Sequence, residues 1–212
     1  MSKRAGTDHP IQELLASRWS PYAFDRRPVS KADVLSLFEA ARWAASSFNE
    51  QPWHYLIATQ DDPAEFAKLL SCLVEGNQAW AKAAPVLAIS VASLNFKLNG
   101  KPNKAAIHDL GLAAGNLTVE ATARGLAVHQ MIGIVPERVR ELYQIPEGYE
   151  AVTGLAIGYV GDPQRLPDKL RQRDLAPRAR KPLKDFLFSG QWSRPLPLAA
   201  LPHGIIKQNS EG

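Results

Sequence analysis

Two pairs of residues have the spacing and the chemistry to hold an anion. Arg18 and Ser20 stand two residues apart in SRWSPYAF, where a guanidinium fork beside a hydroxyl suits a phosphate group. Arg178 and Arg180 stand two residues apart in RARKPL, and on an extended chain both side chains point the same way. Together the two segments indicate a phosphate-bearing ligand, although each taken singly also fits a solvent-facing charge.

A third segment, SSFNEQPW, has the composition of a loop that binds a polar ring. Four hydrogen-bonding side chains fall within six positions, directly before an apolar run: Ser46, Ser47, Asn49 and Gln51. A heterocycle with several donors and acceptors along its edge needs a set of this kind. The simpler alternative is a surface turn, in which these side chains only satisfy the backbone.

The sequence lacks the usual sets of catalytic residues. It holds five histidines, and none is paired with another histidine or with cysteine at the spacing of metal ligands. It also has no phosphate loop, no GxGxxG after a strand and no GxSxG elbow. We therefore expect no metal site, hydrolase or kinase. If the protein is an enzyme, a bound organic cofactor is expected to carry its reaction.

The composition favours a globular protein with one local basic segment. The 212 residues are 45% apolar and 22% charged, which is near the average for globular domains. The net charge of +4 equals the excess of seven basic over three acidic residues between Gly161 and Lys181. A nucleic-acid-binding protein more often carries a broad basic face, so we expect no nucleic-acid partner.

Cysteine usage and hydropathy indicate a cytoplasmic protein. Cys72 is the one cysteine, so no disulfide forms within a chain, and its apolar surroundings indicate a buried thiol. The first ten residues contain no apolar core of the signal-peptide kind, and no apolar run is long enough to cross a bilayer. We expect no membrane partner.

Hydrophobic periodicity predicts helices that alternate with strands. The predicted helices are 11–16, 30–43, 62–74, 77–84, 104–124 and 136–145, and the predicted strands are 54–59, 86–93, 126–131 and 151–160. Ser30 is the expected N-cap of the second helix, with Asp33 as the capping-box acid. Residues 161–182 are rich in proline and charge, so they are predicted as an ordered loop or a linker. This order favours an α+β sandwich with a mixed sheet flanked by helices.

The predicted helix at 104–124 is apolar around nearly its whole circumference. Its sequence, KAAIHDLGLAAGNLTVEATAR, has almost no polar half, and a helix of this kind should be buried on every side. In a chain of this length, a second subunit is one way to bury it. The helix therefore predicts the centre of a homodimer; the alternative is a central helix in a monomer.

Five motifs together resemble the nitroreductase family of FMN-binding flavoproteins. They are SRWSPYAFDRRPVS, AASSFNEQPW, the alanine-rich helix that ends in RGLAV, IPEGYEAVTGLAIGYVGDP and RARKPL. The resemblance covers residues 11 to 192, and the asparagine loop is its most specific part. It implies an α+β sandwich that is an obligate dimer with two FMN sites at the subunit interface.

By position, the resemblance assigns FMN-binding roles to particular residues. The implied set is Arg18, Trp19 and Ser20; Ser46, Ser47, Asn49 and Gln51 from the other subunit; the backbone amides of Ile132 and Gly133; and Arg178 and Arg180 at the phosphate. No catalytic acid or base is implied, because flavin N5 carries the hydride. The implied FMN-binding domain spans 11–192, between a flexible N-terminus at 1–10 and a C-terminal extension at 193–212.

The implied function is hydride transfer from NADH or NADPH to a small organic acceptor, such as a nitroaromatic or a quinone, by a ping-pong cycle. The alternatives are a non-catalytic flavin-binding or storage protein, and a family member that performs reductive dehalogenation or flavin fragmentation. The chain departs from the family at Tyr22, where an arginine or lysine is common. Such a cation would favour anionic reduced flavin, and Lys82 is a candidate to replace it.

Overall fold

The structure, a computed structural model, describes residues 3–197 and consists of two units. The larger unit is Arg18–Ala176, and the smaller unit combines Met1–Ser17 with Pro177–Gly212. Most of the predicted C-terminal extension, from residue 198 on, lies outside the described residues.

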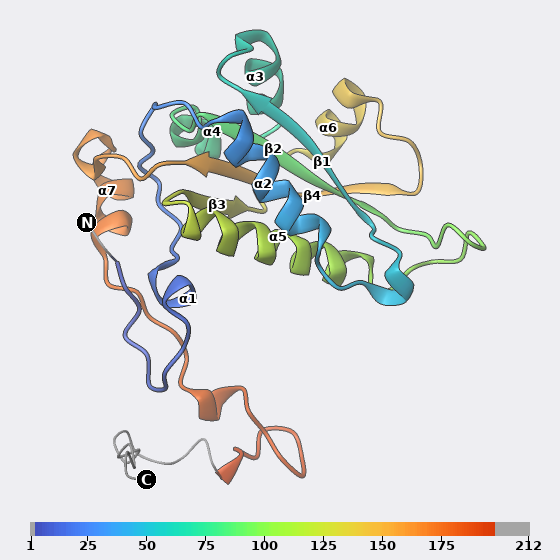
Figure 1. Cartoon of the computed structure of the whole chain (residues 1–212), viewed down its shortest axis with the longest axis vertical. Coiled ribbons are helices and arrows are strands. Elements are labelled where there is room, and N and C mark those ends of the chain that lie inside the picture. The colour runs from blue at the N-terminus through green and yellow to red at the C-terminus, as the bar shows by residue number, and fades with distance from the viewer. Residues whose placement is uncertain (1–2, 198–212) are drawn as a thin grey trace. The chain divides into compact units, whose positions relative to one another are not determined.

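The described residues form seven α-helices and four β-strands, and all except α1 belong to the larger unit (Figure 1). They are α1 (Glu13–Ser17), α2 (Lys31–Arg42), β1 (Trp53–Thr59), α3 (Pro63–Leu70), α4 (Glu75–Ala81), β2 (Val86–Ser93), α5 (Ala106–Ala123), β3 (Ala127–Met131), α6 (Pro136–Tyr143), β4 (Tyr149–Gly158) and α7 (Asp168–Leu175). Short 3-10 turns lie at Ser47–Asn49, Pro163–Arg165 and Leu183–Asp185.

The order of the first ten elements agrees with the sequence prediction, but helix α7 was missed. It lies inside residues 161–182, which were predicted as a loop or linker. The prolines that suggested a loop stand at its borders, because Pro167 is the residue before the helix and Pro177 follows its cap at Ala176. Proline is compatible with the edge of a helix and breaks only its interior.

All four strands pair antiparallel, in the order β1–β2–β4–β3. The prediction of a mixed sheet is therefore wrong for the described residues. Strands β2 and β3 run in the same direction and are linked through α5, as in a crossover between parallel strands. However, β4 lies between them in the sheet and runs the opposite way, so no two parallel strands become neighbours.

Helices cover both faces of the sheet, which confirms the α+β sandwich. Side chains on β2 alternate between the two faces, as the period of a strand requires. Leu87 and Ile89 pack in a cluster with residues of α3, α4 and α6. Val86 and Ala88 pack in a second cluster with residues of α2 and α5, which lie side by side in Figure 1.

Helix ends carry the caps that the sequence predicted. The Ser30 hydroxyl accepts a hydrogen bond from the Asp33 amide at 3.0 Å and donates one to the Asp33 carboxylate at 2.7 Å. Helix α5 is followed by Gly125, whose φ of +71° favours glycine. Pro136 occupies the first position of α6, as expected.

Helix α5 is buried on one side only within a single chain. Leu110, Ala113 and Leu117 are buried among the sheet and α2, whereas Ile107 and Leu112 are 44% and 40% exposed. The apolar outer face predicted from the sequence is therefore present. A second subunit that covers it stays a prediction.

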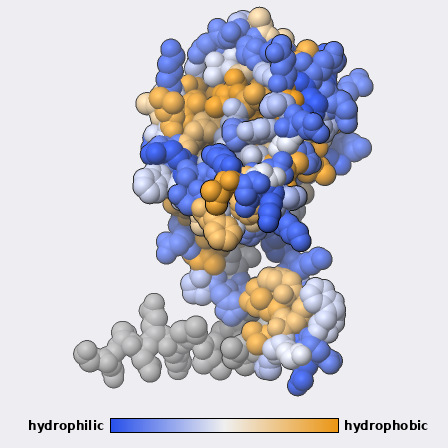
Figure 2. Space-filling model, turned by 90° about the vertical axis from the view of Figure 1, so that its right-hand side faces the viewer, coloured by the Kyte–Doolittle hydropathy of each residue, from blue (hydrophilic) through white to orange (hydrophobic). Residues whose placement is uncertain are grey.

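The surface of the larger unit mixes apolar and polar residues. Figure 2 shows apolar areas interrupted by hydrophilic side chains on the face that it presents. The most exposed large apolar side chains of this unit are Leu35, Trp43, Phe48, Leu98 and Ile132. In the part of the chain that the structure describes, no helix has both the length and the apolar character needed to cross a membrane.

We expect Asp174→Ala to lower the free energy of unfolding by about 1–3 kcal/mol. The buried Asp174 carboxylate on α7 accepts hydrogen bonds from the amides of Tyr22 and Ala23, at 2.8 and 3.0 Å. Its removal would leave two donors unpaired in a buried position. Urea unfolding followed by circular dichroism measures the change.

The matched control for this experiment is Asp168→Ala on the same helix. Its side chain is 82% exposed and pairs with Arg171 at the surface, so the change should stay within about 0.5 kcal/mol. Equal effects of the two substitutions would contradict the role given to Asp174.

Candidate functional site

The loop at residues 46–51 has a strained backbone. Phe48, Asn49 and Gln51 have φ values of 53°, 55° and 50°, in the left-handed region that residues other than glycine rarely adopt. Each such residue costs about 1–3 kcal/mol and persists only where the surrounding structure determines it; such residues cluster at functional sites. Three in four positions therefore mark this segment, predicted from its polar side chains, as a candidate ligand-binding loop. We call it the flavin loop, after the ligand that the family resemblance implies for it.

Hydrogen bonds fix the backbone of the flavin loop and leave side chains available. The Gln51 amide donates to the Ser46 hydroxyl at 3.0 Å, and the Gln51 side chain donates to the Asn49 carbonyl at 3.1 Å. The Ser47 amide donates to the Asp109 carboxylate at 2.9 Å. The side chains of Ser47 and Asn49 make no hydrogen bond to any described residue, so both are free for a ligand.

The sequence analysis did not single out Asp109. The signal was present, because Asp109 is the one acidic residue between Lys104 and Val119 in a helix that is otherwise mostly apolar. A charge at a buried position of such a helix needs a polar partner. Here that partner lies 62 residues away along the chain.

Arg18 and Ser20 lie together, as their spacing predicted. The Arg18 guanidinium donates to the Ser20 hydroxyl at 3.2 Å, and the intervening Trp19 is half-buried. The following residue, Pro21, is held from β3, because its carbonyl lies 2.8 Å from Nδ1 of His129. With Asp174 holding the next two amides, this segment has a fixed backbone next to a guanidinium and a hydroxyl.

The backbone after β3 offers two adjacent hydrogen-bond donors. The amides of Ile132 and Gly133 donate to no residue that the structure describes, and Ile132 is 87% exposed. The carbonyl of Gly133 is held from the opposite side, because it accepts from the Asn77 side chain and from the Val74 amide, each at 3.0 Å. Two free amides in a fixed backbone suit a polar ring edge with acceptor atoms.

Arg178 and Arg180 belong to the smaller unit, and their guanidinium groups contact different carbonyls. Arg178 donates to the carbonyls of Lys3 and Ala16, at 2.8 and 2.6 Å, and burial lowers its pKa below the ordinary value. Arg180 is exposed and donates to the neighbouring Ala179 carbonyl at 2.7 Å. Arg178 therefore ties together two parts of its own unit. The phosphate-binding role of both residues stays a prediction.

Different elements hold the flavin loop and the Arg18 segment of the larger unit. The flavin loop is bonded to Asp109 in the first turn of α5, and Figure 1 shows it beside that end of the helix. Pro21 is bonded to β3, the strand that follows the other end of α5. Strand β3 runs back along α5, because the side chain of Gln130, next to His129, donates to the Thr118 hydroxyl in the second half of the helix at 3.0 Å.

Aromatic residues near Tyr22 form core rather than an open pocket. Trp80 is only 3% exposed, and its ring contacts those of Tyr22 and His129 at centroid distances of 5.1 and 4.5 Å. Trp80 is therefore a packing residue of the core. Lys82, the candidate replacement for a cation at residue 22, is exposed at the end of α4.

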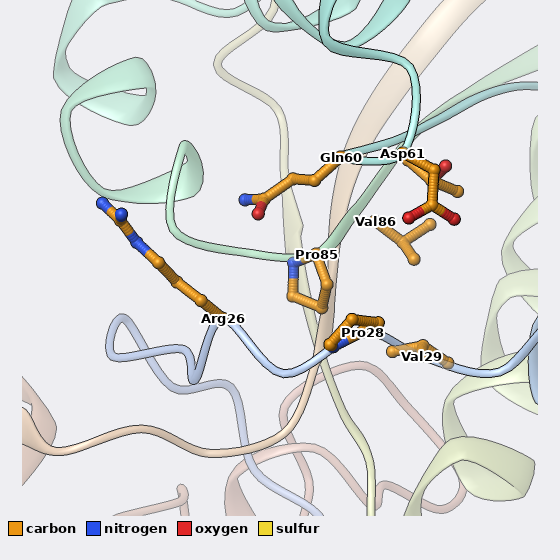
Figure 3. Close-up of a pocket in the computed structure, with 8 residues that line it drawn as sticks. Arg26, Pro28, Val29, Gln60, Asp61, Pro85 and Val86 are labelled. Carbon is orange, nitrogen blue, oxygen red and sulfur yellow. The ribbon is translucent and has the colours of Figure 1, made fainter.

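A cavity of about 250 Å³ lies apart from every predicted site residue. It is lined by the segment before α2, the end of β1 and the start of β2: Arg26, Pro28, Val29, Thr59, Gln60, Asp61, Pro85 and Val86. In Figure 3, Arg26 and Asp61 lie on opposite sides of Pro85. The Gln60 side chain is already engaged, because it donates to the carbonyls of Lys82 and Ala84. The cavity contributes no residue to the candidate site.

Comparison with known proteins identifies the family. The sequence model of the Nitroreductase family matches residues 15–159, which include the Arg18 segment, the flavin loop and the Ile132–Gly133 amides. The chain belongs to the Nitroreductase family. The family and the class of enzyme expected from the five motifs are therefore confirmed.

Individual relatives agree with this assignment. The chain is 27% identical over 191 residues to the major NAD(P)H-flavin oxidoreductase of Aliivibrio fischeri, covering 71% of this chain and 88% of that protein. It is 33% identical over 134 residues to an uncharacterized 15.4 kDa protein of Mycolicibacterium smegmatis, covering 62% of this chain and 86% of that protein. A crystal structure of an oxidoreductase containing FMN has a TM-score of 0.86 at 35% identity, covering 92% of this chain and 98% of that chain.

We expect Gly133→Ala to destabilise the fold by about 1–3 kcal/mol. A Cβ at residue 133 would overlap the Asn77 side-chain amide and lie 2.9 Å from a methyl group of Val74. The neighbouring control, Gly76→Ala in α4, meets no atom within 4 Å and should stabilise the helix by about 0.5–1 kcal/mol. Thermal unfolding measures both variants, and a shift of the same sign in both would contradict this account.

The stability of the larger unit should fall as the pH drops below about 6.5 because of His129. Burial lowers the pKa of His129, although the Pro21 carbonyl and Asp174 act in the opposite direction and Arg18 adds to the lowering. At low pH the unfolded chain binds a proton at His129 that the folded chain does not bind. The contribution of neutral His129 to the free energy of unfolding is therefore complete above the unfolded pKa and is lost as the pH falls.

Urea midpoints between pH 7.5 and 5.5 test this dependence. His129→Gln should show a smaller loss over that range than the wild type, because the titrating group is gone. His54→Gln, at an exposed position on β1, should keep the wild-type dependence. An unchanged pH dependence in His129→Gln would rule out this source.

Proposed function

We propose that this protein is an FMN-dependent oxidoreductase that passes hydride from NADH or NADPH to a small organic acceptor, such as a nitroaromatic or a quinone. The observation that carries the proposal is the flavin loop, whose strained backbone leaves the side chains of Ser47 and Asn49 free for a ligand. Membership of the Nitroreductase family and similarity to an oxidoreductase containing FMN support it.

The donor set of the larger unit fits FMN. The guanidinium of Arg18 and the hydroxyl of Ser20 provide the charge-assisted contacts that a phosphate needs. Ser47, Asn49 and Gln51 offer hydroxyl and amide groups to the ribityl chain and the ring. The amides of Ile132 and Gly133 are suited to the acceptor atoms on the edge of the ring.

Bound FMN supplies the hydride-carrying centre, N5 of its ring, so the protein needs no acid–base residue of its own. The residues of the chain bind and orient the ring, and Ile132 presents an apolar surface beside the two amides. A nicotinamide and the acceptor then use the same place in turn, which is a ping-pong order. Orientation of the reacting groups is the main contribution of the protein to the rate.

The proposed site needs a second copy of the chain. The flavin loop is held at the first turn of α5 and the Arg18 segment at β3, and we infer that one copy supplies only part of the set to any one FMN. The outer face of α5 supports such a pairing, because Ile107 and Leu112 are exposed there. A homodimer that covers this face would bring the flavin loop of one copy to the Arg18 segment of the other.

Visible spectroscopy and turnover test the proposed function. The purified protein should show flavin absorption and release FMN on denaturation, and it should oxidise NADH or NADPH steadily with a nitroaromatic or quinone. Parallel double-reciprocal lines would support the ping-pong order. A colourless protein that takes up no added FMN overturns the proposal, and bound FMN without steady turnover favours the storage alternative.

Mixed dimers of two variants that bind FMN weakly test whether the site is shared between copies. Arg18→Ala and Asn49→Ala should each raise the Kd for FMN roughly tenfold or more, since each loses a contact worth about 1–3 kcal/mol. In a mixed dimer, one site carries both lesions and the other carries neither. Refolding the two variants together should therefore restore wild-type affinity at part of the sites, whereas mixing either with itself should not. The absence of any recovery in proven mixed dimers would show that both residues serve one site from the same copy.

A further inference from the structure

The conformation of the flavin loop requires an anchor outside the loop. Most of its hydrogen bonds run between its own residues, such as those from Gln51 to Ser46 and Asn49, and these move with the loop. Among residues 3–197, two hydrogen bonds connect it to other elements. The Glu50 carboxylate accepts from the Lys97 amide at 2.6 Å, on a hairpin whose tip is exposed, and the Ser47 amide donates to Asp109 on α5.

Asp109 is the anchor that belongs to the core. It is 3% exposed, and its neighbour Leu110 packs against the sheet from the first turns of α5. The loop is thus fixed at Ser47, immediately before Phe48 and Asn49, the first two residues with left-handed backbone. A connection at this point limits the freedom of the chain where the strained conformation begins.

The surroundings of Asp109 are unfavourable for a residue that serves stability alone. No ion pair joins its carboxylate to a cation among the described residues, and the Ser47 amide is its one side-chain hydrogen-bond partner there. The positive end of the α5 dipole offsets part of the cost of burying this charge. An apolar residue of similar size generally packs at such a position without that cost.

We propose that Asp109 is a positioning residue, which holds the flavin loop in its binding conformation through the Ser47 amide. The consequence for FMN rests on the proposed function. When the loop is ordered in advance, less conformational freedom is lost on binding, and the affinity is higher. Without the anchor, the loop also adopts conformations that lack the left-handed backbone, and these do not present the side chains of Ser47 and Asn49 together.

Two substitutions at Asp109 separate positioning from packing. Asp109→Leu removes the acceptor and the charge while keeping the number and branching of the side-chain heavy atoms, and it should raise the Kd for FMN about tenfold while the thermal stability of the apoprotein is kept or increased. Asp109→Asn keeps an oxygen that accepts from the Ser47 amide, and it should bind FMN within about twofold of the wild type. The control Leu110→Ala should lower the thermal stability without changing the FMN affinity of the folded protein.

Hydrogen exchange of the Ser47 amide in the apoprotein makes the test independent of FMN. The amide should be protected in the wild type and in Asp109→Asn, and it should exchange faster in Asp109→Leu. If Asp109→Leu keeps both the protection and the FMN affinity, or if Asp109→Asn is as impaired as Asp109→Leu, the proposal is overturned. If the exchange follows the expectation but no variant binds FMN, the anchor is established and the proposed function fails.

Discussion

Burial of β2 on both faces is the constraint on which the rest of the larger unit depends. All eight residues of this strand are buried, so each face must be covered by helices. Leu87 and Ile89 face one layer, and Val86 and Ala88 face the other. The helices that complete these layers fix the positions of the connecting segments, and those segments carry the candidate site. The chemistry is therefore placed at the margins of the sheet.

The same arrangement separates the parts of the site. Helix α5 lies along one face of the sheet, with the flavin loop bonded to its first turn through Asp109. The strand that returns from its other end holds the segment around Pro21 through His129. The helix packs against the sheet with Ala113 and Leu117 and leaves an apolar outer face exposed. The proposed association of two copies would account for both the separately held binding segments and the exposed apolar face.

The sequence predicted the features that depend on neighbouring residues. The Ser30 cap and the apolar run of β2 each have a local cause, and each was found where expected. The sheet could not be predicted in this way, because the insertion of β4 between β2 and β3 depends on the pairing of distant strands. Helix α7 was missed because prolines at its borders resemble those of a loop.

Long-range contacts similarly limited the prediction of the site. The motifs identified the flavin loop and the Arg18 segment, but the pairing of Ser47 with Asp109 joins residues 62 positions apart. Arg178 is a second example, since the basic pair could be recognised in the sequence while its contacts with Lys3 and Ala16 could not. A polar residue can be assigned to a ligand from its type, but its internal partners depend on the complete fold.

Because different elements hold the flavin loop and the Arg18 segment, the proposed site couples FMN binding to the assembly of two copies. In the proposed dimer, FMN contacts the Arg18 segment of one copy and the flavin loop of the other, so it binds the pair more tightly than either copy alone. A ligand that prefers the assembled form stabilises that form by mass action. In this proposal Asp109 orders the loop around Phe48 and Asn49 in the single chain, which lowers the entropy cost of forming the shared site. An ordered loop on each copy and an apolar face between the copies would therefore favour the same assembled state.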